Sequence, residues 1–226
     1  MRYLMAIFAA GLVLTGGLRW ATRSFESMSG LSGLPTPLYV ALTVIVVVRL
    51  VRSPIGWAGI GFNVPFRPVR HVALGLAAAA AVVLAGELLT PLWIALFEGG
   101  RDLSRFEATV GTLPGLIGLL VFSWLFAAFG EELAFRGALM RGLASVLDGG
   151  RGAILFAYFL QAIIFALVHV YQGPAGVAGT FVSGLIYGGV VLIAGGSLWP
   201  AMLAHGFSNS YGLISLWLQA NPNTAM

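Results

Sequence analysis

Two adjacent glutamates at the end of a long uncharged run constrain this chain more than any other feature. Residues 113–129 carry no charged side chain, and Gly130-Glu131-Glu132-Leu133-Ala134-Phe135-Arg136 follows directly. An uncharged run of this length predicts a membrane-spanning helix. An ionisable group inside a bilayer costs roughly 2.5–3.5 kcal/mol on insertion scales. The acids therefore either mark a functional site or end the helix among the lipid headgroups.

Helix geometry gives the two acids different surroundings. Glu132 precedes Arg136 by four residues, which is the favourable order for an ion pair on one helix face. Glu131 is rotated from Glu132 by about 100°, because an α-helix has 3.6 residues per turn. We therefore predict that Glu132 pairs with Arg136 and that Glu131 remains available for chemistry.

The composition indicates a membrane protein. Of the 226 residues, 59% are hydrophobic and 9% are charged, whereas soluble domains carry about 25% charged residues. There is no cysteine, which excludes disulfides and thiolate metal ligands. In a membrane protein, the excess of basic over acidic residues, all of them arginine, indicates how the chain is oriented in the membrane and that it contacts membrane lipids. It does not indicate nucleic-acid binding. We expect an all-α, polytopic membrane helical bundle.

The apolar runs predict about seven transmembrane helices in a single domain covering residues 1–226, because we find no internal repeat and no long linker. The predicted spans are residues 3–18, 38–51, 72–97, 113–129, 153–170, 177–194 and 198–218. The first run lacks the A-x-A cleavage site of a signal peptide. With seven spans, seven arginines fall on the N-terminal side and four on the other, which places the N-terminus in the cytoplasm.

Segments between the spans also carry expectations. Residues 52–70 combine arginines, prolines and aromatic residues, including Trp57 and Phe62, which is typical of the membrane interface. His71 follows this segment and is expected at the interface too. The helical pattern continues beyond Arg136 to Leu147 with a polar side, so this continuation is expected at the surface. Small residues spaced four apart, Gly184 with Gly188 and Gly179 with Ser183, permit close helix contact.

Four polar residues stand in otherwise apolar spans and form the candidate site. They are Glu131, His169, His205 and Asn209. Each histidine alone could simply hold two helices together by a hydrogen bond. Burying all four at unrelated places would cost several kcal/mol, whereas one cluster lets them satisfy each other. We therefore predict a shared intramembrane polar pocket.

Such a pocket has the groups of a hydrolase. A carboxylate and an imidazole can deprotonate a water, and a second imidazole with an amide can stabilise an oxyanion. Ser208 lies only three residues from His205, so we expect it to bond a backbone carbonyl rather than act as nucleophile. Glu131, His169 and His205 could instead hold zinc, since two histidines and a glutamate are a known catalytic set.

Three motifs in series resemble the CPBP intramembrane proteases, the family of CAAX proteases and bacteriocin-processing enzymes. The motifs are Glu131-Glu132-x-x-x-Arg136, Phe165-x-x-x-His169 and His205-x-x-x-Asn209. The resemblance covers a catalytic core of about residues 113–219. The segment 56–67 is also similar to the loop that precedes the core in bacterial members.

The resemblance implies an endopeptidase with assigned residues. Glu131 would activate water together with His169, while His205 and Asn209 would stabilise the oxyanion. Glu132, Arg136 and Phe165 would support them, and no cofactor is expected, with zinc as the alternative.

The resemblance also implies a substrate and a location. The substrate would be a membrane-associated peptide or protein, and the location a bacterial cytoplasmic membrane. Family members that cleave prenylated CAAX substrates tend to have an eighth span, which this sequence does not show, so we favour other substrates, bacteriocins among them. The competing function is a non-catalytic scaffold or bacteriocin self-immunity protein that retains the fold. A transporter should show internal repeats, and we find none.

Overall fold

The computed structural model describes residues 58–222 and the single positions 45, 48 and 52, and within this part it contains helices and no strand. The predicted all-α class is confirmed for these residues. The elements are η1 (Ala58–Phe62), α3 (Pro68–Phe97), α4 (Ser104–Val110), the long helix Leu113–Val146, α7 (Arg151–Leu167), η4 (Val170–Gln172), α8 (Gly173–Ile193) and α9 (Trp199–Ala220).

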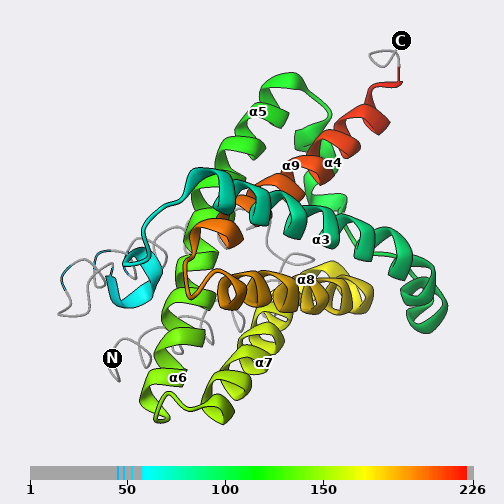
Figure 1. The fold of residues 1–226 in the computed structure, drawn as a ribbon. Coiled ribbons are helices and arrows are strands. Elements are labelled where there is room, and N and C mark those ends of the chain that lie inside the picture. The colour runs from blue at the N-terminus through cyan, green and yellow to red at the C-terminus, as the bar shows by residue number, and fades with distance from the viewer. Residues whose placement is uncertain (1–44, 46–47, 49–51, 53–57, 223–226) are drawn as a thin grey trace.

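The long helix Leu113–Val146 positions the acid pair near its middle (Figure 1). It begins with a cap, because the Thr112 side chain accepts a hydrogen bond of 3.2 Å from the Gly115 N–H. Its parts are α5 (Leu113–Phe122), the π-helical segments η2 (Ser123–Glu131) and η3 (Leu133–Arg141), and α6 (Gly142–Val146). π-Helical turns are rare in proteins, and those that occur are often located at functional sites. Glu131 and Glu132 lie at the junction of the two π-helical segments.

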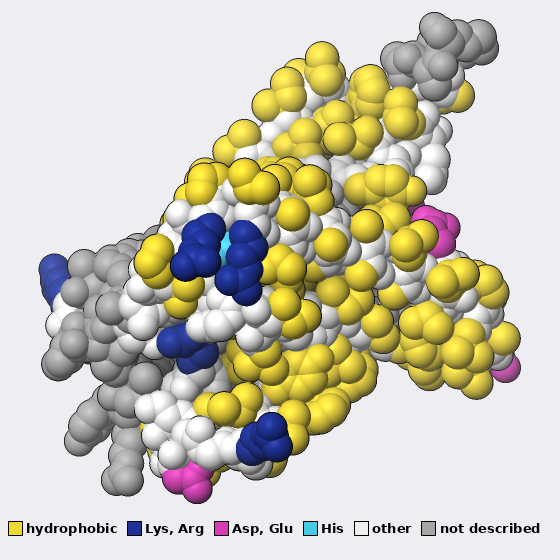
Figure 2. Space-filling model, viewed as in Figure 1, with side chains coloured by type: hydrophobic (Ala, Val, Ile, Leu, Met, Phe, Trp, Pro, Cys, Tyr) yellow, Lys and Arg dark blue, Asp and Glu magenta, His cyan; other side chains and the backbone are white. Residues whose placement is uncertain are grey.

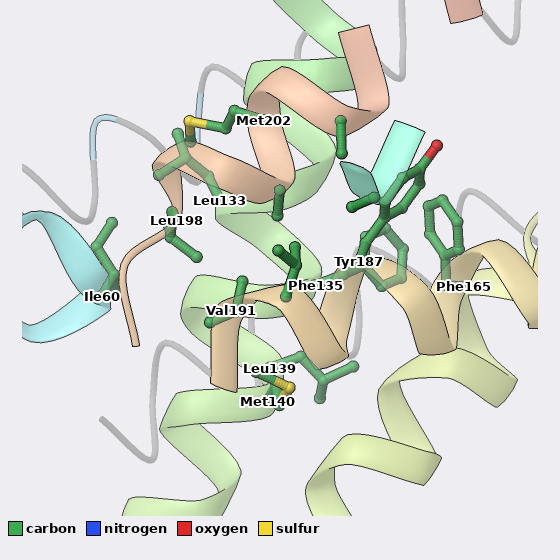
Figure 3. Close-up of a cluster of buried hydrophobic side chains, with 14 of the residues drawn as sticks. Ile60, Leu133, Phe135, Leu139, Met140, Phe165, Tyr187, Val191, Leu198 and Met202 are labelled. Carbon is green, nitrogen blue, oxygen red and sulfur yellow. The ribbon is translucent and has the colours of Figure 1, made fainter. Parts of the chain in front are cut away.

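α7, α8 and α9 pack against this helix, and α3 lies outside them. α3 contacts both α8 and α9, α7 packs along α8, and η2 contacts α9 (Figure 1). The buried hydrophobic side chains form a core where η3, α7, α8 and α9 meet (Figure 3). Phe135, Phe165 and Tyr187 lie at one end of this core. This arrangement brings residues from four separate segments to one place inside the bundle.

Glycine allows the close contact between α7 and α8. A Cβ atom on Gly184 would lie 3.1 Å from Ala162 Cα, and one on Gly188 would lie 2.7 Å from Gln161 Nε2. The predicted close approach at this glycine pair is therefore confirmed. The second small pair is different, since a Cβ on Gly179 would meet no atom within 4 Å.

Three helices in the described part are long and apolar enough to cross a membrane. They are α3, Leu113–Val146 and Val170–Ile193, with α7 as a shorter apolar helix. The visible face of the molecule is largely hydrophobic (Figure 2), as expected for a surface in contact with lipid. The protein is therefore an integral membrane protein, while the number of seven spans is not confirmed. The predicted spans 3–18 and 38–51 lie outside the described residues, except for Ile45 and Val48.

The helix beyond the acid pair does not lie at the surface as expected. Arg136 is completely buried, and Leu133, Phe135 and Leu139 are buried as well. The sequence pattern correctly predicts a polar side on this helix. That side faces partners of Arg136 inside the bundle and does not face water. Only the end of the continuation is exposed, where Leu147 has 42% of its side-chain surface accessible.

Residues 60–62 pack against the protein core to a greater extent than an interfacial segment would. Ile60 is fully buried, and the Phe62 ring meets Trp199 edge-on with centroids 5.2 Å apart. Gly61 has a φ of 118°, and a Cβ there would lie 2.6 Å from the Gly196 carbonyl oxygen. Only glycine fits such a conformation and contact.

His71 is buried rather than exposed at the interface, with 1% of its surface accessible. Its Nδ1 atom accepts a hydrogen bond from the Arg67 N–H at 3.2 Å, so it satisfies a backbone donor at the start of α3. Its ring also packs against Phe66. Trp57 lies outside the described residues.

Candidate active site

Glu132 and Arg136 form the predicted ion pair in the interior of the bundle. Arg136 Nη1 lies 2.9 Å from Glu132 Oε1, and neither side chain is accessible. Arg136 Nη2 also donates to the Gly184 carbonyl at 3.2 Å. The guanidinium carbon lies 4.3 Å from the centre of the Phe165 ring and 5.2 Å from that of Tyr187. These contacts stabilise a charge that would otherwise be costly to bury.

The same glutamate also binds His205. His205 Nδ1 lies 2.8 Å from Glu132 Oε1. A carboxylate paired with Arg136 is ionised and can only accept, so His205 Nδ1 carries a proton and donates it. The other ring nitrogen, Nε2, lies 3.9 Å from Glu131 Oε2. The imidazole is therefore placed between the two adjacent carboxylates, and Glu131 is directed to the nitrogen that Glu132 does not occupy.

The orientation of His205 is further held by its neighbours on α8 and α9. Its ring stacks on Tyr187 with centroids 4.8 Å apart and an interplanar angle of 17°. The Tyr187 hydroxyl is 2.5 Å from Ser208 Oγ, and Ser208 Oγ donates to the His205 carbonyl at 3.1 Å. The prediction that Ser208 bonds a backbone carbonyl is confirmed.

Phe165 connects the two histidines of the candidate site. Its ring centroid lies 4.9 Å from that of His169 and 6.0 Å from that of His205. His169 Nδ1 lies 2.8 Å from the Phe165 carbonyl oxygen. A carbonyl only accepts, so Nδ1 carries the proton and Nε2 is the nitrogen that can take a proton in the neutral ring. The four-residue spacing in the sequence thus sets the tautomer of His169.

Asn209 lies on the same side of α9 as His205 but contacts a different part of the long helix. Its Nδ2 atom donates to Ser123 Oγ at 3.0 Å, and Ser123 is buried. α9 therefore makes polar contacts with both ends of η2, from Asn209 to Ser123 at its start and from His205 to Glu131 at its end. The remaining N–H of the Asn209 amide can donate to another group.

The described residues do not form a metal centre. Among them, no group of three or more histidine, aspartate or glutamate side chains is arranged to hold a metal ion. His169 Nδ1 and His205 Nδ1 are both used in hydrogen bonds, and the Phe165 ring contacts both imidazoles. These bonds leave Nε2 of each histidine available, so the alternative zinc set of Glu131, His169 and His205 stays a prediction.

Three residues of the site were not anticipated from the sequence: Ser123, Gln161 and Tyr187. Gln161 is fully buried and donates to the Gly184 carbonyl at 3.0 Å, the same atom that Arg136 binds. A glutamine in the apolar run 153–167 was a visible signal for Gln161. Nothing in the sequence marks Tyr187 or Ser123 as a site residue, because membrane-spanning helices often contain tyrosine and serine.

A comparison with known families covers this same region. Residues 113–211 match the family model described as type II CAAX prenyl endopeptidase Rce1-like. The matched segment contains both glutamates, both histidines of the site, Arg136 and Asn209. No curated protein and no solved structure matches the chain. Residues 113–211 of the chain are therefore similar to the CAAX proteases, the family that its three motifs resemble.

Proposed function

We propose that the protein is an intramembrane endopeptidase that hydrolyses peptide bonds of membrane-associated peptides or proteins. The observation that carries the proposal is the buried contact of His205 with Glu132 and Glu131. The centre of this apolar helix bundle contains two carboxylates, an arginine and imidazoles. Burying such groups costs free energy, so their presence inside the membrane indicates a functional site. The match of residues 113–211 to a family model of CAAX prenyl endopeptidases supports the same activity.

Glu131 and His169 are the groups we assign to water activation. Glu131 accepts a proton from the water as the water oxygen forms a bond to the carbonyl carbon of the substrate. His169 presents Nε2 as a further acceptor, because its Nδ1–H is held by the Phe165 carbonyl. A positioned general base of this kind contributes typically 10²–10⁴-fold to the rate.

His205 and Asn209 are assigned to the oxyanion that forms when water attacks the carbonyl. His205 can donate from Nε2 only when its ring is protonated, since Nδ1–H already donates to Glu132. Both adjacent carboxylates lie against this ring. Loss of one oxyanion donor typically costs 10²–10³-fold in kcat. Collapse of the intermediate breaks the carbon–nitrogen bond, and the amine leaves with the proton that Glu131 accepted.

Cleavage of membrane-anchored peptides by the purified protein in detergent tests this proposal. Glu131→Gln keeps the shape of the side chain and removes the base, so cleavage should be lost while the protein still folds. Glu87→Gln is the matched control, because Glu87 lies on the exposed side of α3 and no role in the site is assigned to it. Cleavage by Glu131→Gln at the wild-type rate would overturn the assignment. If the wild type cleaves none of a broad peptide panel, the scaffold or self-immunity function replaces the protease.

We also propose that a prenyl group on the substrate is not required. A pair of peptides that differ only in a farnesyl group on one cysteine checks this. Similar kcat/KM values for the two peptides are expected. A preference of a hundredfold or more for the farnesylated peptide would contradict this expectation and leave the assignment of the site residues intact.

A further inference from the structure

Arg101 lies in the loop between α3 and α4, beside the segment that carries His169. Its Nε atom donates to Gln172 Oε1 at 2.8 Å. The next residue, Asp102, donates its N–H to the Gln172 carbonyl at 3.0 Å. Gln172 in turn donates its N–H to the His169 carbonyl at 2.9 Å. One short series of hydrogen bonds thus connects Arg101 to a residue of the candidate site.

Gln172 is a rigid support for the arginine. It is 2% exposed, and its Nε2 donates to the Tyr171 hydroxyl at 3.0 Å. Gly176 on the first turn of α8 provides the space, because a Cβ there would lie 2.3 Å from Gln172 Cβ and 3.4 Å from Arg101 Cγ. The loop that carries Arg101, the segment of Gln172 and the first turn of α8 therefore hold the Arg101 side chain in place. The hydrogen bond from Nε to Gln172 fixes the guanidinium on one side.

The other end of the guanidinium is unused by the part of the chain that the structure describes. Arg101 makes no ion pair there, and Nε is its only hydrogen-bonding atom. The two terminal amino groups can together bind a carboxylate in the end-on, two-bond geometry that arginine favours. A fixed guanidinium loses less side-chain freedom on binding than a mobile one would.

Arg101 is exposed to solvent, although protein atoms lie around its guanidinium. The side chain is exposed, yet the protein atoms around the guanidinium desolvate it and lower its pKa, while Tyr171 and Tyr187 act in the opposite direction. Tyr187 is the residue on which His205 stacks, and the Tyr171 ring lies 5.7 Å from that of His169. Arg101 is therefore accessible to a ligand and is held beside the turn that carries His169.

We propose that Arg101 binds a carboxylate of the substrate and thereby selects peptides that carry one near the scissile bond. This inference rests on the proposed protease function and adds a determinant of specificity to it. The carboxylate is either the C-terminal group of the peptide or an acidic side chain. Arg101 acts in binding and does not contact the reacting atoms.

Three peptides test the proposal: two of the same sequence, one with a free C-terminus and one with a C-terminal amide, and a third that has the amide and one residue near the C-terminus replaced by glutamate. Wild-type KM should be lower for a peptide with a carboxylate than for the amide by roughly tenfold or more, from the strength of charged hydrogen bonds. Arg101→Gln should remove this difference with little change in kcat. The peptide of lower KM identifies which carboxylate is bound.

Arg101→Lys and Arg151→Gln are the companion variants. Lysine keeps the charge but has no second N–H pair and no Nε bond to Gln172, so it should restore only part of the preference. Arg151 is exposed at the start of α7, and its substitution should keep the full preference. An equal loss of kcat on all three peptides in Arg101→Gln would show a structural effect on the His169 turn and overturn the proposal.

Two further arms separate this proposal from its alternatives. Binding of the three peptides to Glu131→Gln measures the carboxylate preference without cleavage, so a failed protease assay leaves this test intact. No difference in Kd between the free acid and the amide would overturn the role of Arg101. An effect of Arg101→Gln that occurs only in vesicles containing phosphatidylglycerol would assign the arginine to a lipid phosphate and would equally overturn it.

Discussion

Glu132 and His205 are in direct contact, with 2.8 Å between Oε1 and Nδ1, although 73 residues separate them in the chain. The same oxygen accepts from Arg136 at 2.9 Å. One oxygen of Glu132 therefore makes both contacts. It balances the charge of Arg136, and it fixes which nitrogen of His205 carries a proton. The adjacent Glu131 faces the other nitrogen of the same ring, so the two neighbouring acids have distinct positions around His205.

Replacing Glu132 by glutamine should destabilise the protein. The change leaves Arg136 and His205 without the negative charge that both contact, and removing one partner of a buried ion pair costs about 3–5 kcal/mol. Thermal unfolding in detergent should show a much lower midpoint than for the wild type. Glu131→Gln should have a smaller effect, because Glu131 is not the partner of Arg136. A fully stable, inactive Glu132→Gln beside an active Glu131→Gln would reverse the two roles.

Gly188→Ala should also lower stability, for a steric reason. The new Cβ would lie 2.7 Å from Gln161 Nε2 and 3.0 Å from the Tyr158 ring. α8 would have to move away from α7, and the Gly184 carbonyl that holds Arg136 would move with it. Overpacking of this kind typically costs 1–3 kcal/mol. The measurement is the unfolding midpoint together with kcat.

Gly179→Ala is the matched control on the same helix. A Cβ at this position meets nothing within 4 Å, so the change should be neutral or slightly stabilising through the higher helix propensity of alanine. If both alanine variants lowered stability equally, the close contact between α7 and α8 would not be the cause.

The parts of this structure that follow a local spacing rule are those that the sequence predicts. The ion pair of Glu132 with Arg136 and the bond from Ser208 to the His205 carbonyl both join residues within one helical turn. The close packing at Gly184 follows from side-chain size alone. The first two depend on helix geometry and not on how the helices are arranged, and the small size of Gly184 permits close contact with any neighbouring helix.

The parts that sequence reasoning missed depend on that arrangement. Rotation by one residue suggested that Glu131 and Glu132 have separate surroundings, but a ring inserted from α9 meets both. The burial of Arg136 was missed because an arginine at the end of an apolar run also suits a headgroup region. Its partners Gly184, Phe165 and Tyr187 come from α7 and α8, and no spacing in the sequence links them to it.

Chelation should leave the proposed protease active. The described glutamate and histidine side chains are not arranged as a metal-binding group, and the water can be activated by Glu131. Peptide cleavage after treatment with a strong chelator should retain the kcat of the untreated protein. Loss of cleavage that added zinc restores would instead make Glu131, His169 and His205 metal ligands.

Tyr187 should act on catalysis through the position of His205. Its ring stacks on the imidazole, while its hydroxyl bonds Ser208, so the two contributions can be separated. Tyr187→Phe keeps the ring and should cost about 0.5–1.5 kcal/mol of stability with kcat close to that of the wild type. Tyr187→Leu removes the flat surface that holds the imidazole, and misplacement of a catalytic group by about 1 Å can lower kcat by 10²-fold.

The comparison requires kcat and KM for both variants, because a misplaced His205 should lower kcat and leave KM largely unchanged. Tyr211→Leu is the control on α9, since Tyr211 is 51% exposed. If Tyr187→Phe lowered kcat as much as Tyr187→Leu, the hydroxyl bond to Ser208 and not the stacked ring would hold His205. If neither variant changed kcat, then Glu132 alone would be sufficient to orient the imidazole.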